Sequence, residues 1–402
     1  MKLYLFNPDT DMALANHRPN YIAPARVRQM AEELALLPVW YATPGSRVLA
    51  PSAYNLRFLK EIKRQFGMDV EVMTLPEVAE HATLELSPWG WNKALTARLA
   101  EAGVAAGLLP TAEELEHYRS RNSRTWVAQA LARLTQQEGC CGASANLYTL
   151  EECRAYVQEH DCCLLKEPWS SSGKGLNWCR KGFNDSIAGW CRRVLAEQGA
   201  VAASPIYNKV WDFAMEFRVE NGRASFEGYS WFSTNQSGAY TGNRLLDTTE
   251  IECELLRYLP PHLLKAVRHM LEEEILPPYA QLPTAYIGVD MMVCRDESGA
   301  CCLHPCVEIN PRMNMGVLAL HLQRNYLAAG SHGRFMIEYH PLSDELHETV
   351  QRFSANNPLN VEKGRIVSGF MPLVPLTPAS HYLAYVDVHE RPSINQGSQQ
   401  AT

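Results

Sequence analysis

The sequence predicts a mixed protein, with a small parallel α/β domain first and α+β segments after it. Apolar strand patterns alternate with amphipathic helix patterns over the first 75 residues, which is typical of a parallel sheet. Further along, strand patterns follow one another across short turns such as Asn221-Gly222, which favours antiparallel hairpins. Because 402 residues exceed one ordinary core, we expect more than one domain.

The composition is that of an ordinary globular protein, with 46% hydrophobic and 20% charged residues. A formal net charge of −7 argues against a dedicated nucleic-acid surface. No run of 18 apolar residues occurs, so no membrane span is expected. The N-terminus turns polar too soon for a secretory signal. We therefore expect a cytoplasmic protein without nucleic-acid or membrane partners.

Twelve cysteines are present, without any Cys-x-x-Cys pair. In a chain of this length they do not form a disulfide framework, and many lie within strand or helix patterns. The sequence favours reduced thiols over metal ligands.

The first domain is expected over residues 1–118. The amphipathic pattern at 56–66 is the clearest helix, with further helices at 24–37, 92–102 and 112–118. Strands are expected at 2–7, 38–42, 47–50 and 70–74.

Polar residues cluster directly after the first strand. Because ligands bind beyond the carboxyl ends of parallel strands, this cluster is a candidate for contact with a second substrate. Asn, Asp and Pro also form capped turns, so the pattern leaves both interpretations open. The cluster consists of Asn7, Asp9, Asp11, Asn16, His17 and Arg18.

Two further units are expected at residues 119–208 and 209–345. The first should contain strands at 145–148, 162–167, 178–180 and 201–207, with helices at 125–135, 150–159 and 186–196. The second should contain strands at 213–219, 224–231, 285–293 and 301–309, a polar loop at 233–243, a long helix pattern at 252–275 that is broken near Leu259-Pro-Pro261, and a helix at 318–327. Strands at 366–373 and 383–388 should pack back in a segment 346–390, before a disordered tail at 391–402.

A strand that ends in a serine- and glycine-rich loop is the first candidate for chemistry. Leu164 and Leu165 lead into Lys166, and Ser170–Gly175 contains small residues interrupted only by Lys174. Glycines allow backbone N–H groups to approach anionic oxygens, and the lysine adds a positive charge. The pattern suits a nucleotide triphosphate, although such loops are commonly plain turns.

A second candidate lies far downstream, on two apolar strands. Asp290 interrupts one strand, while Glu308 and Asn310 lie two residues apart on the next and therefore share a face. A hairpin would place all three together. Two carboxylates and an amide oxygen are hard ligands suited to Mg²⁺ or Mn²⁺. Arg312 follows on the same side, where it would hold a phosphate or acyl-phosphate.

These pieces resemble the ATP-grasp superfamily, in particular its carboxylate–amine ligases. The matching motifs are Leu165-Lys-Glu-Pro168 with its loop, Gly288-Val-Asp290, and Glu308-Ile-Asn-Pro-Arg312, in the same order and with similar spacing over residues 119–325. The resemblance implies two α+β subdomains that clamp ATP, preceded by the small parallel α/β domain.

The resemblance also implies roles for individual residues. Arg312, Lys166 and Arg244 would act on the transferring group. Asp290, Glu308 and Asn310 would bind magnesium, and Asp212 would bind the ribose. The lid over the phosphates would consist of Ser171, Ser172, Gly173, Lys174 and Gly175, and the adenine hinge of Pro205, Ile206 and Tyr207. Where family members carry a first lysine, this chain offers Arg121 or Arg124.

The activity implied is that of an ADP-forming ligase. ATP would phosphorylate a small-molecule carboxylate, and an amine or similar nucleophile would attack the acyl-phosphate. Two alternatives stay open: a nucleotide sensor without catalysis, and a small-molecule kinase on the same fold. The sequence identifies neither substrate, and it leaves a homo-oligomer open.

Overall fold

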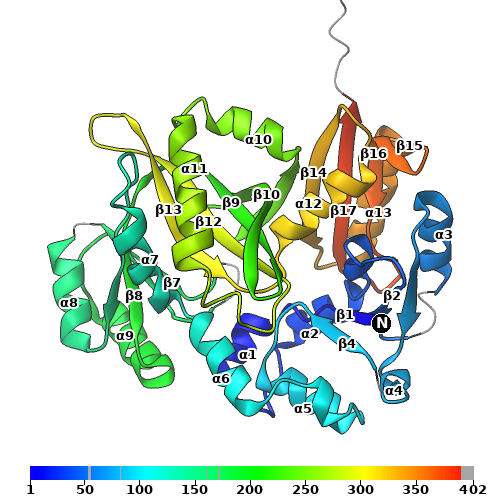
Figure 1. The fold of residues 1–402 in the computed structure, drawn as a ribbon, viewed down its shortest axis with the longest axis horizontal. Helices are drawn as coiled ribbons and strands as arrows, with labels where there is room; N and C mark the ends of the chain where they lie inside the picture. Colours follow the sequence, from blue (N-terminus) through cyan, green and yellow to red (C-terminus); the bar gives the residue numbers. More distant parts are fainter. Residues whose placement is uncertain (53–55, 82, 161, 171–172, 391–402) are drawn as a thin grey trace, which may run out of the picture.

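A computed structural model of the chain describes residues 1–52, 56–81, 83–160, 162–170 and 173–390. The tail expected at 391–402 lies outside the described residues. The described residues form three sheets of four, four and nine strands (Figure 1).

The first sheet is parallel throughout, with the strand order β3-β2-β1-β4. Three of its helices, α4, α5 and α6, begin at side-chain caps, such as the Thr111 and Glu114 capping box that starts α6. Its strands are β1 (Lys2–Leu5), β2 (Ser46–Leu49), β3 (Val70–Met73) and β4 (Glu85–Pro88); its helices are α1 (Thr10–Asn16), α2 (Ala25–Glu33), α3 (Leu56–Phe66), α4 (Leu75–Val78), α5 (Lys93–Glu101) and α6 (Ala112–Arg121).

One prediction in this region was wrong. The strand expected at 38–42 is instead a 3₁₀ helix, η1 (Leu37–Trp40), with Pro38 in its first turn. All four residues are buried, and the Trp40 indole N–H donates to the carbonyl of Leu373 at 2.7 Å. A short segment that is apolar on every side carries no periodicity to separate a strand from a helix.

The second sheet is antiparallel and has the order β5-β8-β6-β7. Helices α8 and α9 supply buried side chains such as Val157 and Ile187 to its core. The strands are β5 (Ala145–Leu147), β6 (Cys163–Lys166), β7 (Leu176–Cys179) and β8 (Val201–Pro205); the helices are α7 (Val127–Leu134), α8 (Leu150–Glu159) and α9 (Asp185–Gln198).

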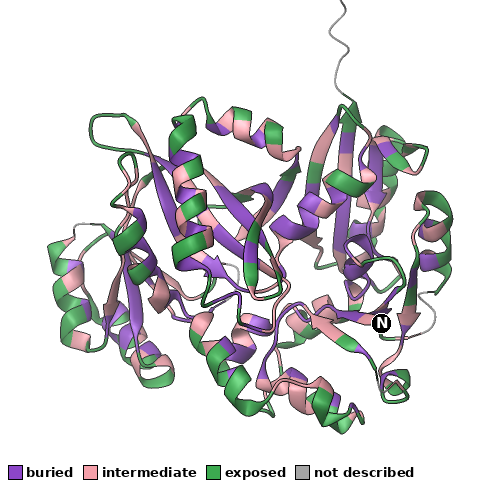
Figure 2. Cartoon of the chain, viewed as in Figure 1, coloured by how far each residue is buried: buried purple, intermediate pink, exposed green. Residues whose placement is uncertain are grey.

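The third sheet has nine strands in the order β13-β12-β9-β10-β11-β14-β17-β16-β15. Figure 2 shows its strands mostly buried, whereas the outer faces of helices such as α8 and α9 are exposed. The strands are β9 (Asn208–Glu220), β10 (Arg223–Thr234), β11 (Tyr240–Leu245), β12 (Tyr286–Arg295), β13 (Cys301–Asn310), β14 (Ser331–Tyr339), β15 (Asn360–Glu362), β16 (Arg365–Pro372) and β17 (Tyr382–Glu390).

The helix pattern at 252–275 is broken near Leu259-Pro-Pro261, as predicted. It forms α10 (Thr248–Leu255) and α11 (Pro261–Met270), and a π turn extends α11 over Leu271–Ile275. Prolines separate the two helices, because Pro261 fits only the first turn of a helix. The remaining helices are α12 (Met315–Tyr326) and α13 (Ser343–Asn356).

The polar loop expected at 233–243 is also wrong in part, since β11 covers its second half. This strand pairs with β10 and β14 and so joins the hairpins to the C-terminal strands. Its residues Tyr240-Thr-Gly-Asn243 show no apolar alternation, so only the partners on both sides define it as a strand.

The predicted fold class is confirmed: two α+β units follow a small parallel α/β domain, as the resemblance implies (Figure 1). The second sheet carries Lys166 and its loop, and the large sheet carries Asp290 and Glu308. The two candidate sites therefore lie on different sheets of the same molecule.

Candidate nucleotide and metal site

The register of the β12–β13 hairpin places the expected metal ligands together. Asp290 pairs directly with Glu308, and Gly288 pairs with Asn310. The separation of 18 positions between the two carboxylates is accommodated by a turn at 296–300 and by a bulge between His304 and Glu308. Pro305 lies in the bulge, where its missing N–H costs the ladder little.

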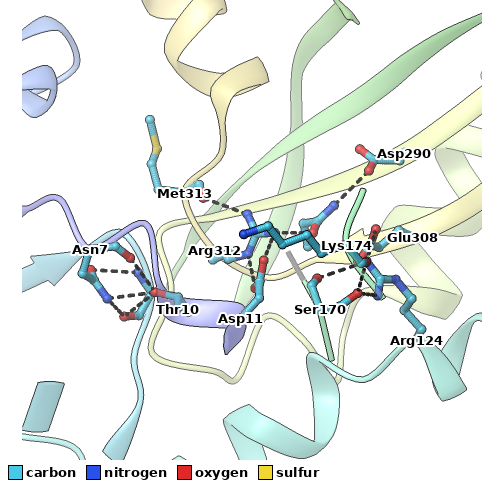
Figure 3. Close-up of polar contacts among 12 residues, drawn as sticks. Asn7, Thr10, Asp11, Arg124, Ser170, Lys174, Asp290, Glu308, Arg312 and Met313 are labelled. Carbon is cyan, nitrogen blue, oxygen red and sulfur yellow. Dashed lines mark hydrogen bonds and ion pairs between the residues drawn. The ribbon is translucent and has the colours of Figure 1, made fainter. Parts of the chain in front are cut away.

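The three predicted metal ligands lie next to one another. The Asn310 amide donates to Asp290 Oδ2 at 3.1 Å (Figure 3). Burial raises the pKa of Asp290 well above its ordinary value, and the carboxylates of Glu308 and Glu216 raise it further. Negative charges held together in this way are stabilised by a bound cation.

This donor set fits Mg²⁺. It offers two carboxylates and an amide oxygen, which are the hard ligands that this ion prefers. Within the described ranges, no group of three or more His, Cys, Asp or Glu side chains is placed to hold a metal. With two carboxylates and one amide, the set would leave coordination positions for substrate phosphates.

Of the two arginines offered in place of the first lysine, Arg124 is the one at the site. Its guanidinium lies 2.9 Å from Glu308 Oε1 and donates to the carbonyls of Glu167 and Ser170 at 2.9 and 3.1 Å. Arg121 instead stacks on Trp126, at 4.0 Å from the ring centre. Arg124 thus joins the metal strand to the lid.

Lys166 ends β6 and faces the same region. Burial, and then the charge of Arg124, lowers its pKa to about 8, while Glu308 opposes this shift. The side chain consequently carries its positive charge at neutral pH. It is positioned by backbone pairing with Ala202 of β8 and Leu176 of β7.

The lid is folded against its own strand. The Glu167 N–H donates to the carbonyl of Gly175 at 2.8 Å, and the Ser170 hydroxyl donates to the carbonyl of Lys174 at 2.7 Å. Gly175 has φ +67°, and a Cβ there would lie 2.6 Å from Ser170. The predicted lid residues Ser171 and Ser172 lie outside the described residues.

The lid also contacts the opposite unit. Gly173 has φ +75°, and a Cβ on it would lie 2.6 Å from the backbone nitrogen of Ala239, in the β10–β11 turn. A Cβ on Gly238 of that turn would lie 3.0 Å from Leu176. The two units therefore meet at glycines that allow a close backbone approach.

Arg312 is held by the N-terminal domain. Its guanidinium forms a bidentate pair with Asp11, both contacts being 2.9 Å, and donates to Asn310 Oδ1 at 2.9 Å (Figure 3). The arginine therefore lies beside the metal ligands, as predicted, but its partner in this state is a carboxylate of the chain itself.

The polar cluster after the first strand divides into two parts. Asn7 and Thr10 are buried and bond to each other at 2.8 Å and to the carbonyl of Gly90, so they form a structural turn. Asp11 belongs to the site through Arg312. His17 pairs with Glu116 at 2.7 Å and stays at the outer end of the helix.

The expected hinge, Pro205, Ile206 and Tyr207, connects β8 to β9. Tyr207 Oη accepts a hydrogen bond from the Ala143 N–H at 2.7 Å, and its ring meets His304 edge-on at 4.9 Å. His304 is only 3% exposed, and burial lowers its pKa to about 3. It is therefore a neutral imidazole beside the hinge.

Asp212 and Arg244 lie on opposite faces of the large sheet. Asp212 pairs with Met292 across β9 and β12, on the Asp290 face, and binds Lys209 and the Thr234 hydroxyl at 2.5 and 2.9 Å. Arg244 pairs with Trp231 and stacks on its ring at 4.3 Å. Because side chains alternate along β10, Trp231 lies on the opposite face of the sheet from its neighbour Ser230, which bonds to Glu216. The structure thus does not bring Arg244 to the predicted site.

The sequence reasoning missed Glu216. It is 1% exposed, accepts hydrogen bonds from Ser230 at 2.8 Å and Asn314 at 2.9 Å, and shares the sheet face of Asp290. Burial raises its pKa to about 7. A charged residue inside the apolar run Phe213–Phe217 was a usable signal, the same one that identified Asp290.

All twelve cysteines are free thiols, as expected. Among the described residues, no helix is both long and apolar enough to cross a membrane.

No protein-family model matches the chain, and no curated protein matches its sequence. Solved structures do resemble it. The biotin carboxylase domain of 2-oxoglutarate carboxylase from Hydrogenobacter thermophilus, in complex with MgADP and bicarbonate, is 10% identical, with 85% of each chain covered and a TM-score of 0.49.

Two ligases or synthetases are similar at the same level. N5-carboxyaminoimidazole synthetase from Staphylococcus aureus, complexed with ADP, is 12% identical over 88% of this chain and 95% of its own, with a TM-score of 0.45. A D-cycloserine synthetase is 14% identical over 70% of this chain and 98% of its own, with a TM-score of 0.40. At these identities and TM-scores we infer no activity from the likeness.

Proposed function

We propose that the chain is an ATP-dependent, ADP-forming ligase that activates a small-molecule carboxylate for attack by an amine or similar nucleophile. One observation carries the proposal. Two carboxylates, an amide and Arg312 lie together on the large sheet, and Arg124 links them directly to the lid on the second sheet. The site thus offers cation ligands and phosphate-binding groups on two facing units.

The residues have distinct roles in this proposal. Asp290, Glu308 and Asn310 hold Mg²⁺, which offsets charge on the transferring phosphoryl group. Lys166 and Arg124 bind phosphate oxygens, and Gly173, Lys174 and Gly175 cover them. The hinge at 205–207 borders the adenine and Asp212 the ribose. No side chain acts as a nucleophile, because the substrate carboxylate attacks the phosphorus directly.

Arg312 has a role that depends on its release. In the described state its guanidinium is neutralised by Asp11. We propose that the acyl-phosphate oxygens replace Asp11 as the bidentate partner, so that Arg312 stabilises the group being transferred. This exchange couples the N-terminal domain to the reaction.

ADP release tests the function. The purified chain should release ADP from Mg·ATP only when a suitable carboxylate and amine are present, as measured over a panel of amino and carboxylic acids. ATP binding without turnover on a broad panel would favour the sensor alternative. A phosphorylated product without ligation would favour the kinase. Absence of nucleotide binding with Mg²⁺ present would overturn the proposal.

A further inference from the structure

A cleft lies between the N-terminal domain and the lid, with a volume of about 740 Å³. One wall comes from α1 and the segment that follows it, and the other from the lid and the end of α9. The lining of the cleft includes Met12, Arg18, Tyr21, Ser170, Lys174 and Arg193.

The cleft carries one uncompensated positive charge, because three cations line it, Arg18, Lys174 and Arg193, against the two carboxylates of Glu167 and Glu197. Arg193 pairs with both carboxylates, with Glu167 at 2.7 Å and with Glu197 at 3.1 Å. Arg18 and Lys174 also line the cleft, and neither forms an ion pair within the part of the chain that the structure describes. Two free cations on facing walls attract an anion into the space between them.

Tyr21 also lines the cleft. Its hydroxyl is buried and, among the described residues, has no hydrogen-bond partner. Burial raises its pKa to about 12, so the O–H stays protonated at neutral pH. A buried hydroxyl without a partner is destabilising, and a ligand oxygen that accepts its hydrogen bond would remove that cost.

The cleft adjoins the proposed site of phosphoryl transfer. Ser170 and Lys174 belong to both the cleft wall and the lid, and Met12 follows Asp11, the partner of Arg312. Figure 3 draws Lys174 and Ser170 in the same close-up as the Asp11–Arg312 pair. An anion held here would therefore lie next to the phosphate end of the nucleotide site.

We infer that this cleft binds the acceptor substrate, and that the acceptor is a small anion held by Arg18 and Lys174 with a hydrogen bond from Tyr21. The assignment of this anion as the acceptor substrate rests on the proposed function, whereas the anion site itself is inferred from the residues that line the cleft. A carboxylate and a phosphate ester share this chemistry, so the test must separate them.

The test compares Arg18→Gln and Tyr21→Phe with Arg28→Gln. Arg28 is an exposed arginine on α2 outside the cleft, so it matches the loss of charge. Succinate and inorganic phosphate are titrated separately into each full-length protein by calorimetry. One of the two probes should bind the wild type. Its affinity should be about tenfold lower for Arg18→Gln and also lower for Tyr21→Phe, whereas its affinity for Arg28→Gln should stay within about twofold of the wild type.

Binding of a Mg²⁺-bound, non-hydrolysable ATP analogue is measured on the same proteins and should be unchanged in all three variants. Equal weakening by Arg18→Gln and Arg28→Gln would overturn the inference, because it would show only an effect of net charge. A wild type that binds the analogue but neither probe would also overturn it. Loss of analogue binding with intact, Arg18-dependent probe binding would support the anion site and overturn only the proposed function.

Discussion

The two units that face each other across the candidate site position their residues in different ways. On the large sheet, Asp290, Glu308 and Asn310 are held by ladder pairing of β12 with both β9 and β13. On the second sheet, the lid is a loop held by a few hydrogen bonds and by glycines at positive φ. Strand register gives fixed ligands, whereas the loop gives a cover that can adapt to a substrate.

Breaking the large-sheet set should have the largest effect. Glu308→Gln keeps the shape of the side chain but removes a charge from the metal set and from Arg124. Because that charge is needed for the cation and the transferring phosphate, ADP release should fall by at least about 100-fold. Steady-state kinetics and a thermal melt would measure it. An active variant with a wild-type melt would exclude Glu308 from catalysis.

Disturbing the lid should have a smaller effect, mainly on nucleotide affinity. Gly175→Ala introduces a Cβ 2.6 Å from Ser170 at φ +67°, whereas Gly182→Ala introduces one at φ +73° with no atom within 4 Å. Both variants bear the backbone strain of about 1 kcal/mol, but only the first displaces the lid.

Affinity for an ATP analogue should therefore drop about tenfold in Gly175→Ala and stay unchanged in Gly182→Ala, by fluorescence titration. Equal affinities in the two variants would show that the lid contributes nothing through this contact.

The buried carboxyl of Glu216 should make the stability of the protein depend on pH. Its pKa rises from an ordinary 4.5 to about 7 in the folded chain, so the folded state binds more protons than the unfolded state between these values. Stability should therefore fall as the pH rises from about 4.5 to 7 and level off above.

In Glu216→Gln this fall should be smaller by about 3 kcal/mol, measured as the free energy of unfolding in urea. Both proteins should be compared at pH 4.5, 6 and 8. Parallel curves for the two proteins would show that Glu216 titrates normally.

Arg244→Ala should have the smallest effect. Its guanidinium stacks on Trp231, on the face of the sheet away from Asp290. Turnover should change by less than about twofold, as for an ordinary surface substitution. A loss of turnover comparable to that of Glu308→Gln would show that Arg244 acts in the reaction, as predicted from the sequence.

The alternation of strands and helices and the β12–β13 hairpin follow from local patterns, because period-2 alternation and a turn at Ser298-Gly299 suffice to place them. The pairing of Asp290 with Glu308 needs in addition the bulge between His304 and Glu308, since the register set by the turn alone would place Cys306 opposite Asp290. The choice of Arg124 over Arg121 does not follow, because the two lie three residues apart and only packing directs one to Glu308 and the other to Trp126.

Local patterns in the sequence were enough to identify a phosphate-sized loop and, far from it, a set of oxygen ligands followed by an arginine. The packing of the three sheets then set which side chains complete the site. It joined Asp11 to Arg312 across 301 positions, buried Glu216 and His304, and turned Arg244 away. Such contacts depend on how sheets pack against each other, and local sequence does not encode that orientation.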